Sequence, residues 1–137
     1  MGLVRFGVSL EKDLLEKFDR LIEKKNYTNR SEAFRDLIRQ ELITKEWAEG
    51  EDIAGTITII YDHHQRELAT KLMDLQHDHG KNIISTQHIH LDHHNCMEII
   101  AVRGSAKEAQ KLADMLKAVR GVKHATLGMS STGKHIE

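Results

Sequence analysis

Histidine is concentrated in one part of this 137-residue chain. Eight of the ten histidines lie between residues 63 and 94, and the single cysteine, Cys96, follows two residues later. Imidazole nitrogen and thiolate sulfur are the ligands with which proteins bind zinc, copper and nickel. The clustering therefore predicts a transition-metal site in this segment.

His88, His90 and Cys96 have the spacing of ligands that converge from one β-hairpin. Side chains two residues apart in a strand point to the same face, so His88 and His90 share a face. A hairpin in which His90 faces Cys96 also places the next pair on that face. His88 then lies opposite Glu98. The pattern predicts three metal ligands, with Glu98 beside them as an acceptor that orients an imidazole.

His77 is the candidate for a fourth ligand, because it falls in the last turn of the helix that precedes the hairpin. The sequence leaves open whether this histidine comes from the same chain or from a neighbour. Three imidazoles and a thiolate suit zinc, nickel(II) or copper, and a planar geometry would favour the last two. The thiol must lose its proton to bind, so metal affinity should fall at low pH. The histidines expected to face solvent, or else to form weaker sites, are His63, His64, His79, His93 and His94.

Two kinds of enzyme are alternatives to a binding site. Cys96 could be a nucleophile with a histidine base, but no Gly-rich loop and no oxyanion site accompany it. A metal-dependent hydrolase needs an open coordination position, whereas four protein ligands close the site. The sequence therefore predicts a protein that is not an enzyme.

The first 48 residues contain the pattern of one strand and two helices. Residues 3–10 alternate apolar and polar side chains, which predicts a half-buried strand. Apolar spacing predicts a helix over 13–25, and Asn29 followed by Glu32 predicts the N-cap of a second helix that ends near Trp47. One strand and two short helices cannot bury their apolar faces, so we expect an intertwined dimer through paired strands.

The paired strands would form a ribbon of the width that fits the major groove of DNA. Its outer face would carry Arg5, Gly7 and Ser9, and arginine and serine can hydrogen-bond to base edges. The start of the second helix offers phosphate contacts from Asn29, Arg30 and Arg35. The net charge of −1 gives no overall attraction to DNA, so double-stranded DNA must be held by these local contacts.

The acidic segment 49–52 is predicted to be a linker, and residues 53–137 a second domain. Strands are expected over 53–61, 83–91, 96–103 and 122–129, with a helix from 62 to about 79 and another over 105–119. The order βαββαβ is that of the ferredoxin-like split arrangement, so the fold class is α+β, with helices on one sheet face. We expect a second copy to cover the other face. The residues expected to be buried in the first of these helices are Leu68, Ala69, Leu72, Met73 and Leu75.

Composition excludes several classes of protein. A single cysteine cannot form an internal disulfide, and a free thiol suits the reducing cytoplasm. No apolar run approaches the roughly 20 residues that cross a bilayer, and no secretory signal precedes the first strand. We therefore expect a cytoplasmic protein that does not bind membranes.

Over residues 3–130 the chain closely resembles the nickel-responsive transcriptional regulators. The resemblance rests on the Asn-Arg-Ser-Glu-Ala start of the second helix and on three motifs in the βαββαβ unit: Gln76-His77, His88-Ile89-His90 and Cys96-Met97-Glu98. It implies a ribbon-helix-helix DNA-binding domain joined to an ACT-like nickel-binding domain. It also implies a homotetramer, a dimer of dimers, that represses nickel-uptake genes when Ni(II) binds.

The resemblance assigns further roles to individual residues. Residues matching His88, His90 and Cys96 of one subunit would bind nickel in planar geometry with His77 of the subunit across the interface. A weaker second cation site would involve Glu32 and Asp36. Positions matching Arg5, Gly7 and Ser9 would contact bases, with Gly7 standing where threonine is common, and Arg35 and Arg66 would contact the DNA backbone.

Two other functions stay open at this point. The ACT-like unit could respond to zinc, copper or another ligand, such as an amino acid. The N-terminal unit alone would also suit an antitoxin, although the well-patterned second unit is untypical of one. Under the preferred hypothesis, metal shared across the tetramer would order the helix that ends near His77 and shift the population toward states that reach two DNA half-sites.

Overall fold

The computed structural model describes residues 2–137. The chain divides between Arg39 and Gln40 into two compact units. No helix in the described part of the chain is long and apolar enough to cross a membrane.

The N-terminal unit is built on α1 (Lys12–Lys24) and the first half of α2 (Arg30–Glu49), as the apolar spacing predicts. The backbone N–H of Glu32 donates a 2.9 Å hydrogen bond to the Asn29 side chain, which confirms the predicted N-cap. The rings of Phe18 and Phe34 pack between the two helices, with centroids 5.3 Å apart.

Residues 3–10 form neither helix nor strand in the single chain, and the strand predicted for two paired copies stays a prediction. A strand is stabilised by hydrogen bonds to a neighbouring strand, and the described residues 2–39 of the N-terminal unit contain no other strand with which this segment could pair. The apolar side chains of the segment consequently remain exposed: Leu3, Val4, Phe6, Val8 and Leu10.

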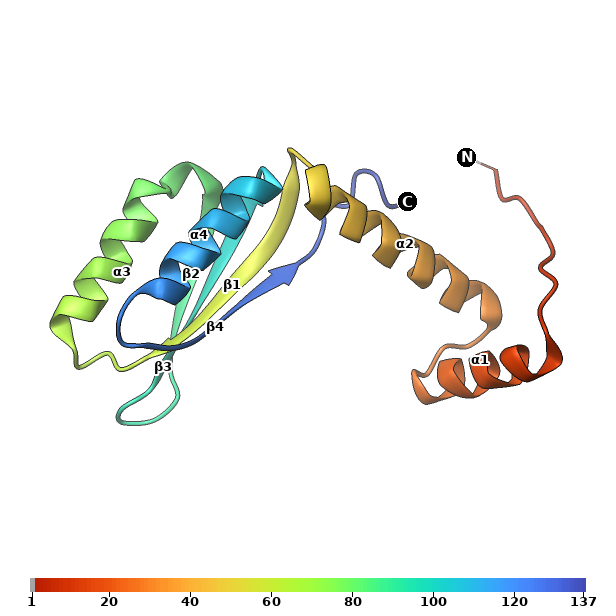
Figure 1. The fold of residues 1–137 in the computed structure, drawn as a ribbon, viewed down its shortest axis with the longest axis horizontal. Helices are drawn as coiled ribbons and strands as arrows, with labels where there is room; N and C mark the ends of the chain where they lie inside the picture. Colours follow the sequence, from red (N-terminus) through yellow and green to blue (C-terminus); the bar gives the residue numbers. More distant parts are fainter. Residues whose placement is uncertain (1) are drawn as a thin grey trace. The chain divides into compact units, whose positions relative to one another are not determined.

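The C-terminal unit has the predicted βαββαβ order (Figure 1). Its elements are β1 (Ile53–Tyr61), α3 (Arg66–Asp78), the 3-10 turn η1 (Gly80–Asn82), β2 (Ile83–His90), β3 (Cys96–Gly104), α4 (Ala106–Ala118) and β4 (Val122–Met129). The strands form one sheet in the order β2-β3-β1-β4, and every neighbouring pair is antiparallel. This is the strand order of the ferredoxin-like arrangement.

Both α3 and α4 cover the same face of this sheet (Figure 1). Alternate residues of β1 and β3 point into the core beneath them, including Ile57, Ile59 and Ile100. Leu68 and Leu72 of α3 are buried as predicted, but Met73 is 69% exposed, so its predicted burial is wrong. Residues 62–65 form a turn before α3 begins, so the helix also starts later than the spacing predicts.

Trp47, near the end of α2, belongs to the core of the C-terminal unit. Its indole Nε1 donates a 2.8 Å hydrogen bond to the carbonyl of Ser130. The ring lies over Gly55, where an added Cβ would come within 2.8 Å of the indole Cζ2 atom. The second half of α2 therefore packs with the unit that follows it, and the predicted division at 48 stays a prediction.

The segment expected to be a linker is likewise held in the C-terminal unit. The carbonyl of Gly50 accepts a 3.0 Å hydrogen bond from the Ala106 backbone, and Asp52 pairs with the Arg103 guanidinium at 3.0 Å. An acidic segment without apolar residues can therefore be ordered by hydrogen bonds and ion pairs alone.

Candidate functional site

The β2–β3 hairpin has the register predicted from the spacing of its ligand-type residues. His90 pairs with Cys96, and His88 pairs with Glu98. These residues lie on the sheet face that carries the helices, because Cys96 and Glu98 are both buried there. The hairpin therefore presents nitrogen, sulfur and carboxylate groups side by side.

Cys96 and His88 are in direct contact, with Sγ 2.6 Å from Nε2. Nitrogen and sulfur ligands lie at about 2.0 and 2.3 Å from a bound metal, so neighbouring ligand atoms are separated by only about 3 to 3.5 Å. These two atoms are thus close enough to bind the same ion. Burial raises the pKa of the Cys96 thiol, so its proton must be displaced when a metal binds.

His90 lies near this pair but packs against a different ring. Its centroid is 5.6 Å from that of His88 and 4.6 Å from that of His63. His77 lies exposed in the last turn of α3. Within one chain, the structure therefore brings together only the His88 and Cys96 donor atoms of the predicted four-ligand set.

Glu98 has partners other than the predicted imidazole. Its Oε2 atom accepts a 3.1 Å hydrogen bond from the Tyr61 hydroxyl, and its Oε1 atom accepts one of 3.2 Å from Gln76 Nε2. Thr86 of β2 in turn donates to Gln76 Oε1 at 3.3 Å. Both carboxylate oxygens thus accept hydrogen bonds from side chains other than an imidazole, and the orienting role of Glu98 stays a prediction. Glu98 holds Gln76, the residue before His77.

The surroundings of the hairpin suit a transition metal. His63 has a buried Nδ1 atom that makes no hydrogen bond within residues 2–137, and its ring lies against His90. Burial and the neighbouring His64 and His90 lower the pKa of His63, which favours the neutral imidazole that binds metals. Imidazole and thiolate donors together fit zinc, nickel and copper better than magnesium or calcium.

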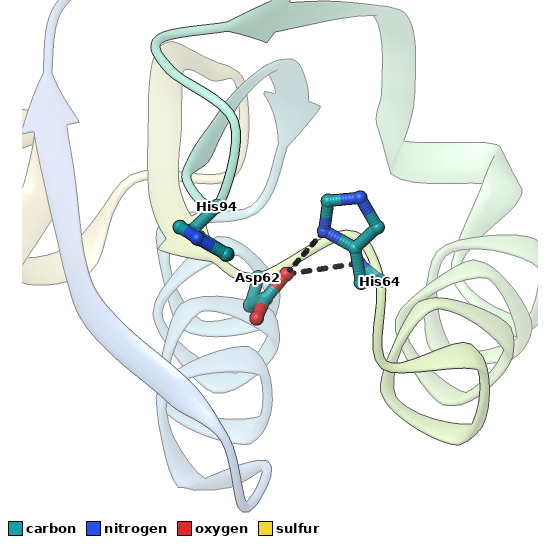
Figure 2. Close-up of side chains that lie close together, drawn as sticks. All are labelled: Asp62, His64 and His94. Carbon is teal, nitrogen blue, oxygen red and sulfur yellow. Dashed lines mark hydrogen bonds and ion pairs between the residues drawn. The ribbon is translucent and has the colours of Figure 1, made fainter.

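A second cluster lies where the β1–α3 connection meets the β2–β3 hairpin. Asp62, His64 and His94 form the one group in the described chain that brings three metal-ligand atoms within 4.8 Å of one another (Figure 2). These histidines were expected to face solvent or to form weaker sites. Sequence spacing could not find the cluster, because its members are brought together by the packing of two separate loops.

The predicted DNA-contact residues of the N-terminal unit are exposed, and two of its arginines make ion pairs. Arg5, Gly7 and Ser9 lie in the segment without regular structure. Arg30 forms a two-pronged ion pair with Asp19 of α1, at 2.8 and 2.9 Å, and Asp19 raises the pKa of the arginine. The remaining predicted contacts divide between two units: Asn29 caps α2, and Arg66 begins α3.

The predicted second cation site contains carboxylates that already have partners. Arg35 pairs with Glu32, one turn away on α2, and the Tyr27 hydroxyl donates to Asp36. A cation at Glu32 and Asp36 would therefore compete with an arginine and a tyrosine.

Comparison with known proteins matches both halves of the chain. Residues 54–130 match the model of the NikR C-terminal nickel binding domain, and residues 4–45 match that of the ribbon-helix-helix protein, copG family. A relative from Syntrophus aciditrophicus is 59% identical over 132 residues, covering 96% of both chains. One from Pyrococcus furiosus is 53% identical over 137 residues, covering 99% of both chains. The names of these relatives describe nickel-responsive regulators.

The chain belongs to the nickel-responsive regulator family.

Membership of the nickel-responsive regulator family confirms the fold class, a ribbon-helix-helix domain followed by a nickel-binding α+β domain. It also confirms the predicted function of a nickel-responsive, DNA-binding transcription regulator, and the prediction that the protein is not an enzyme. The ribbon-helix-helix match includes residues 4–10, which form no strand in the single chain. The family match thus includes the segment for which the strand was predicted.

Proposed function

We propose that this regulator is a cytoplasmic homotetramer that represses nickel-uptake genes when Ni(II) is bound. The metal would be held by His88, His90 and Cys96 of one chain and by His77 of another. The observation that carries the assignment is the contact between the Cys96 thiol and the His88 imidazole, at 2.6 Å. The division into domains 1–48, 49–52 and 53–137 stays part of the proposal.

Exposure of the α3 surface supports a ligand from a second chain. His77 is exposed, and so is Met73, one turn earlier on the same helix face. Ile84 of β2 and Leu91 of the hairpin are also more than half exposed. Apolar side chains of this size favour burial against another surface, so a second copy that brings His77 to a hairpin would also cover apolar area.

The N-terminal unit supports dimer formation for a similar reason. The apolar side chains of residues 3–10 alternate with Arg5, Gly7 and Ser9. Pairing with a second copy would supply the missing backbone hydrogen bonds and bury the apolar face. The polar face would then remain outward, where a two-stranded ribbon can enter the major groove.

DNA backbone contacts require two arginines of the N-terminal unit to exchange partners. Arg30 and Arg35 would leave Asp19 and Glu32 for phosphate oxygens, as Asn29 and Arg66 approach neighbouring phosphates. Exposed ion pairs contribute little to stability, so this exchange costs little. A cation between Glu32 and Asp36 would then neutralise the negative charge of Glu32, which Arg35 no longer pairs with.

The protein groups around the nickel centre have separable tasks. Bound Ni(II) would supply a four-coordinate link between two chains. Cys96 would give up its proton to become the thiolate ligand, and burial of the sulfur keeps water away from it. Glu98 would hold the last turn of α3 through Gln76. A link that orders this turn would shift the population of tetramers toward those that reach two DNA half-sites.

Nickel titration of the full-length protein and of Cys96→Ala tests the proposal. The wild-type protein should develop a thiolate-to-nickel absorption band and bind operator DNA more tightly as nickel is added. Cys96→Ala should lose both responses, whereas His135→Ala, which removes an exposed histidine far along the chain, should keep both. Persistence of both responses without Cys96 would show that the site is misassigned. Metal analysis of the purified protein shows whether the bound metal is nickel or one of the alternatives, zinc or copper.

A further inference from the structure

The connection between β1 and α3 lies against the tip of the β2–β3 hairpin, and the contact is made by polar and imidazole side chains. Asp62 and His64 come from the connection, and His94 comes from the hairpin. Figure 2 shows the Asp62 carboxylate between the two imidazole rings. The three side chains therefore form a cluster outside the predicted nickel ligands.

The carboxylate of the cluster is positioned by its own loop. Asp62 Oδ1 accepts a 2.9 Å hydrogen bond from the backbone N–H of His64 and lies 3.2 Å from the Nδ1 atom of the same residue. The hydrogen bond from the His64 backbone lowers the pKa of Asp62, so this carboxyl group is ionised at neutral pH. A negative charge is thus held beside two imidazoles.

The hairpin backbone that carries His94 is also held by hydrogen bonds. Asp92 Oδ1 accepts 2.8 Å hydrogen bonds from the backbone N–H groups of His94 and Asn95. The Asn95 side chain donates to both Asp92 oxygens, at 3.1 and 2.9 Å. This closed turn fixes the direction from which His94 approaches Asp62. Ligands that are ordered before binding lose less conformational entropy when a metal arrives.

Further imidazoles surround the cluster. The centroid of the His93 ring lies 5.1 Å from that of His64 and 5.0 Å from that of His94. The ring centroids of His63 and His64 are 4.2 Å apart. Two imidazoles and one carboxylate are donors suited to nickel, zinc and copper. Both imidazoles are exposed, so water can occupy the remaining coordination positions.

We propose that Asp62, His64 and His94 form a second transition-metal site in each chain, weaker than the nickel centre. The donor set lacks a thiolate and is open to water, which makes it less stable and more exchangeable than a site with four protein ligands. It is also distinct from the carboxylate pair Glu32 and Asp36. A metal here would tie the hairpin tip to the β1–α3 connection.

Such a link has a direct consequence for the residues beside it. The connection begins immediately after Tyr61, which donates to Glu98, and the hairpin tip lies between His90 and Cys96. Metal at the second site would therefore restrain both loops that flank the predicted nickel ligands. The regulator would acquire a further metal-dependent restraint only at nickel concentrations above those that fill the first site.

Equilibrium dialysis of the full-length protein against nickel chloride, followed by metal analysis, tests this site. The wild-type protein should bind further nickel, one ion per chain, after the thiolate-to-nickel band has reached its maximum. His64→Ala and His94→Ala should each weaken this later binding by at least about tenfold and leave the amplitude and midpoint of the band unchanged. His135→Ala should leave both classes of binding intact.

The experiment separates the second site from the nickel centre. In Cys96→Ala the band should disappear, whereas the weak binding that depends on His64 and His94 should persist. The second site is refuted if the wild-type protein binds no nickel beyond the band, or if the later binding survives both histidine substitutions. Absence of the band from the wild-type protein would instead count against the proposed nickel centre.

Discussion

The amide of Gln76 donates a 3.2 Å hydrogen bond to the buried carboxylate of Glu98. This contact joins the last turn of α3 to β3, and it holds the residue immediately before His77. Because Tyr61 donates to the other carboxylate oxygen, Glu98 links β1, β3 and α3 at the side of the hairpin that carries the predicted ligands. A buried carboxylate thus restrains the last turn of the helix that carries the exposed His77.

Gln76→Ala should lower nickel affinity without removing a ligand. The substitution frees the last turn of α3, so His77 must be ordered when the metal binds. Loss of groups that position metal ligands typically costs about 10 to 100-fold in affinity. Competition with a nickel chelator measures the change, and the thiolate band should keep its shape because Cys96 is untouched. Gln110→Ala, on α4, is the matched control. Equal nickel affinities of the two variants would show that the contact between Gln76 and Glu98 does not support the metal site.

Trp47→Phe should destabilise the C-terminal unit. The substitution removes the hydrogen bond to the Ser130 carbonyl and leaves space over Gly55, at a cost of about 1 to 3 kcal/mol in the free energy of unfolding. Urea unfolding followed by circular dichroism measures this cost, because the chain has no other tryptophan for fluorescence. An unchanged midpoint would show that the second half of α2 does not stabilise this unit.

Glu108 should contribute pH-dependent stability. Asn82 Nδ2 donates a 2.8 Å hydrogen bond to its carboxylate, which, together with Lys81, lowers the pKa of Glu108 below its ordinary value of 4.5. Since the pKa is lower in the folded state, the stabilisation is fully present above pH 4.5 and is lost as pH falls through the lowered value.

The comparison that tests this contribution is Glu108→Gln against the wild-type protein. The difference in free energy of unfolding should be largest near neutral pH and should shrink as the pH falls below 4.5. Glu67→Gln, on α3 and outside this hydrogen-bonded group, is the control. A difference that stays constant down to acid pH would mean that the Asn82 contact does not depend on the charge of Glu108.

Arg5→Ala should weaken operator binding and leave nickel binding intact. An arginine that contacts a guanine with two hydrogen bonds contributes about 1 to 3 kcal/mol to sequence discrimination. The affinity for operator DNA should therefore fall more than the affinity for unrelated DNA of the same length, at equal salt concentration. Lys107→Ala, on α4, is the charge-matched control. Loss of nickel together with loss of operator binding would contradict the separation of the two functions between domains.

Sequence patterns were sufficient for most elements because each has a local cause. The apolar spacing of α1 and α4, the cap formed by Asn29 and the alternation of β1 are all visible in neighbouring residues. The pairing of His90 with Cys96 can also be predicted from local information, since the register of a hairpin is set by its short turn. These expectations needed no knowledge of distant contacts.

The differences between the sequence pattern and the single-chain structure have a common cause in contacts between distant residues. Residues 3–10 alternate correctly but lack a strand partner in one chain. Met73 has helical spacing but lies on the face of α3 that the sheet leaves uncovered. Trp47 packs with Ser130, 83 residues later, so local pattern could not assign the end of α2 to the C-terminal unit.

The amino-acid sequence by itself determined the fold class, the family and the donor types available to a metal, because these depend on residue identity and short-range periodicity. Only the tertiary structure decided which donors meet. In the folded chain Cys96 contacts His88, and Glu98 accepts hydrogen bonds from Gln76 and Tyr61. The cluster of Asp62, His64 and His94 is formed by two separate loops. The physical reason is that donor atoms converge through the packing of strands and loops, whose mutual distances are not encoded in the spacing of any one segment.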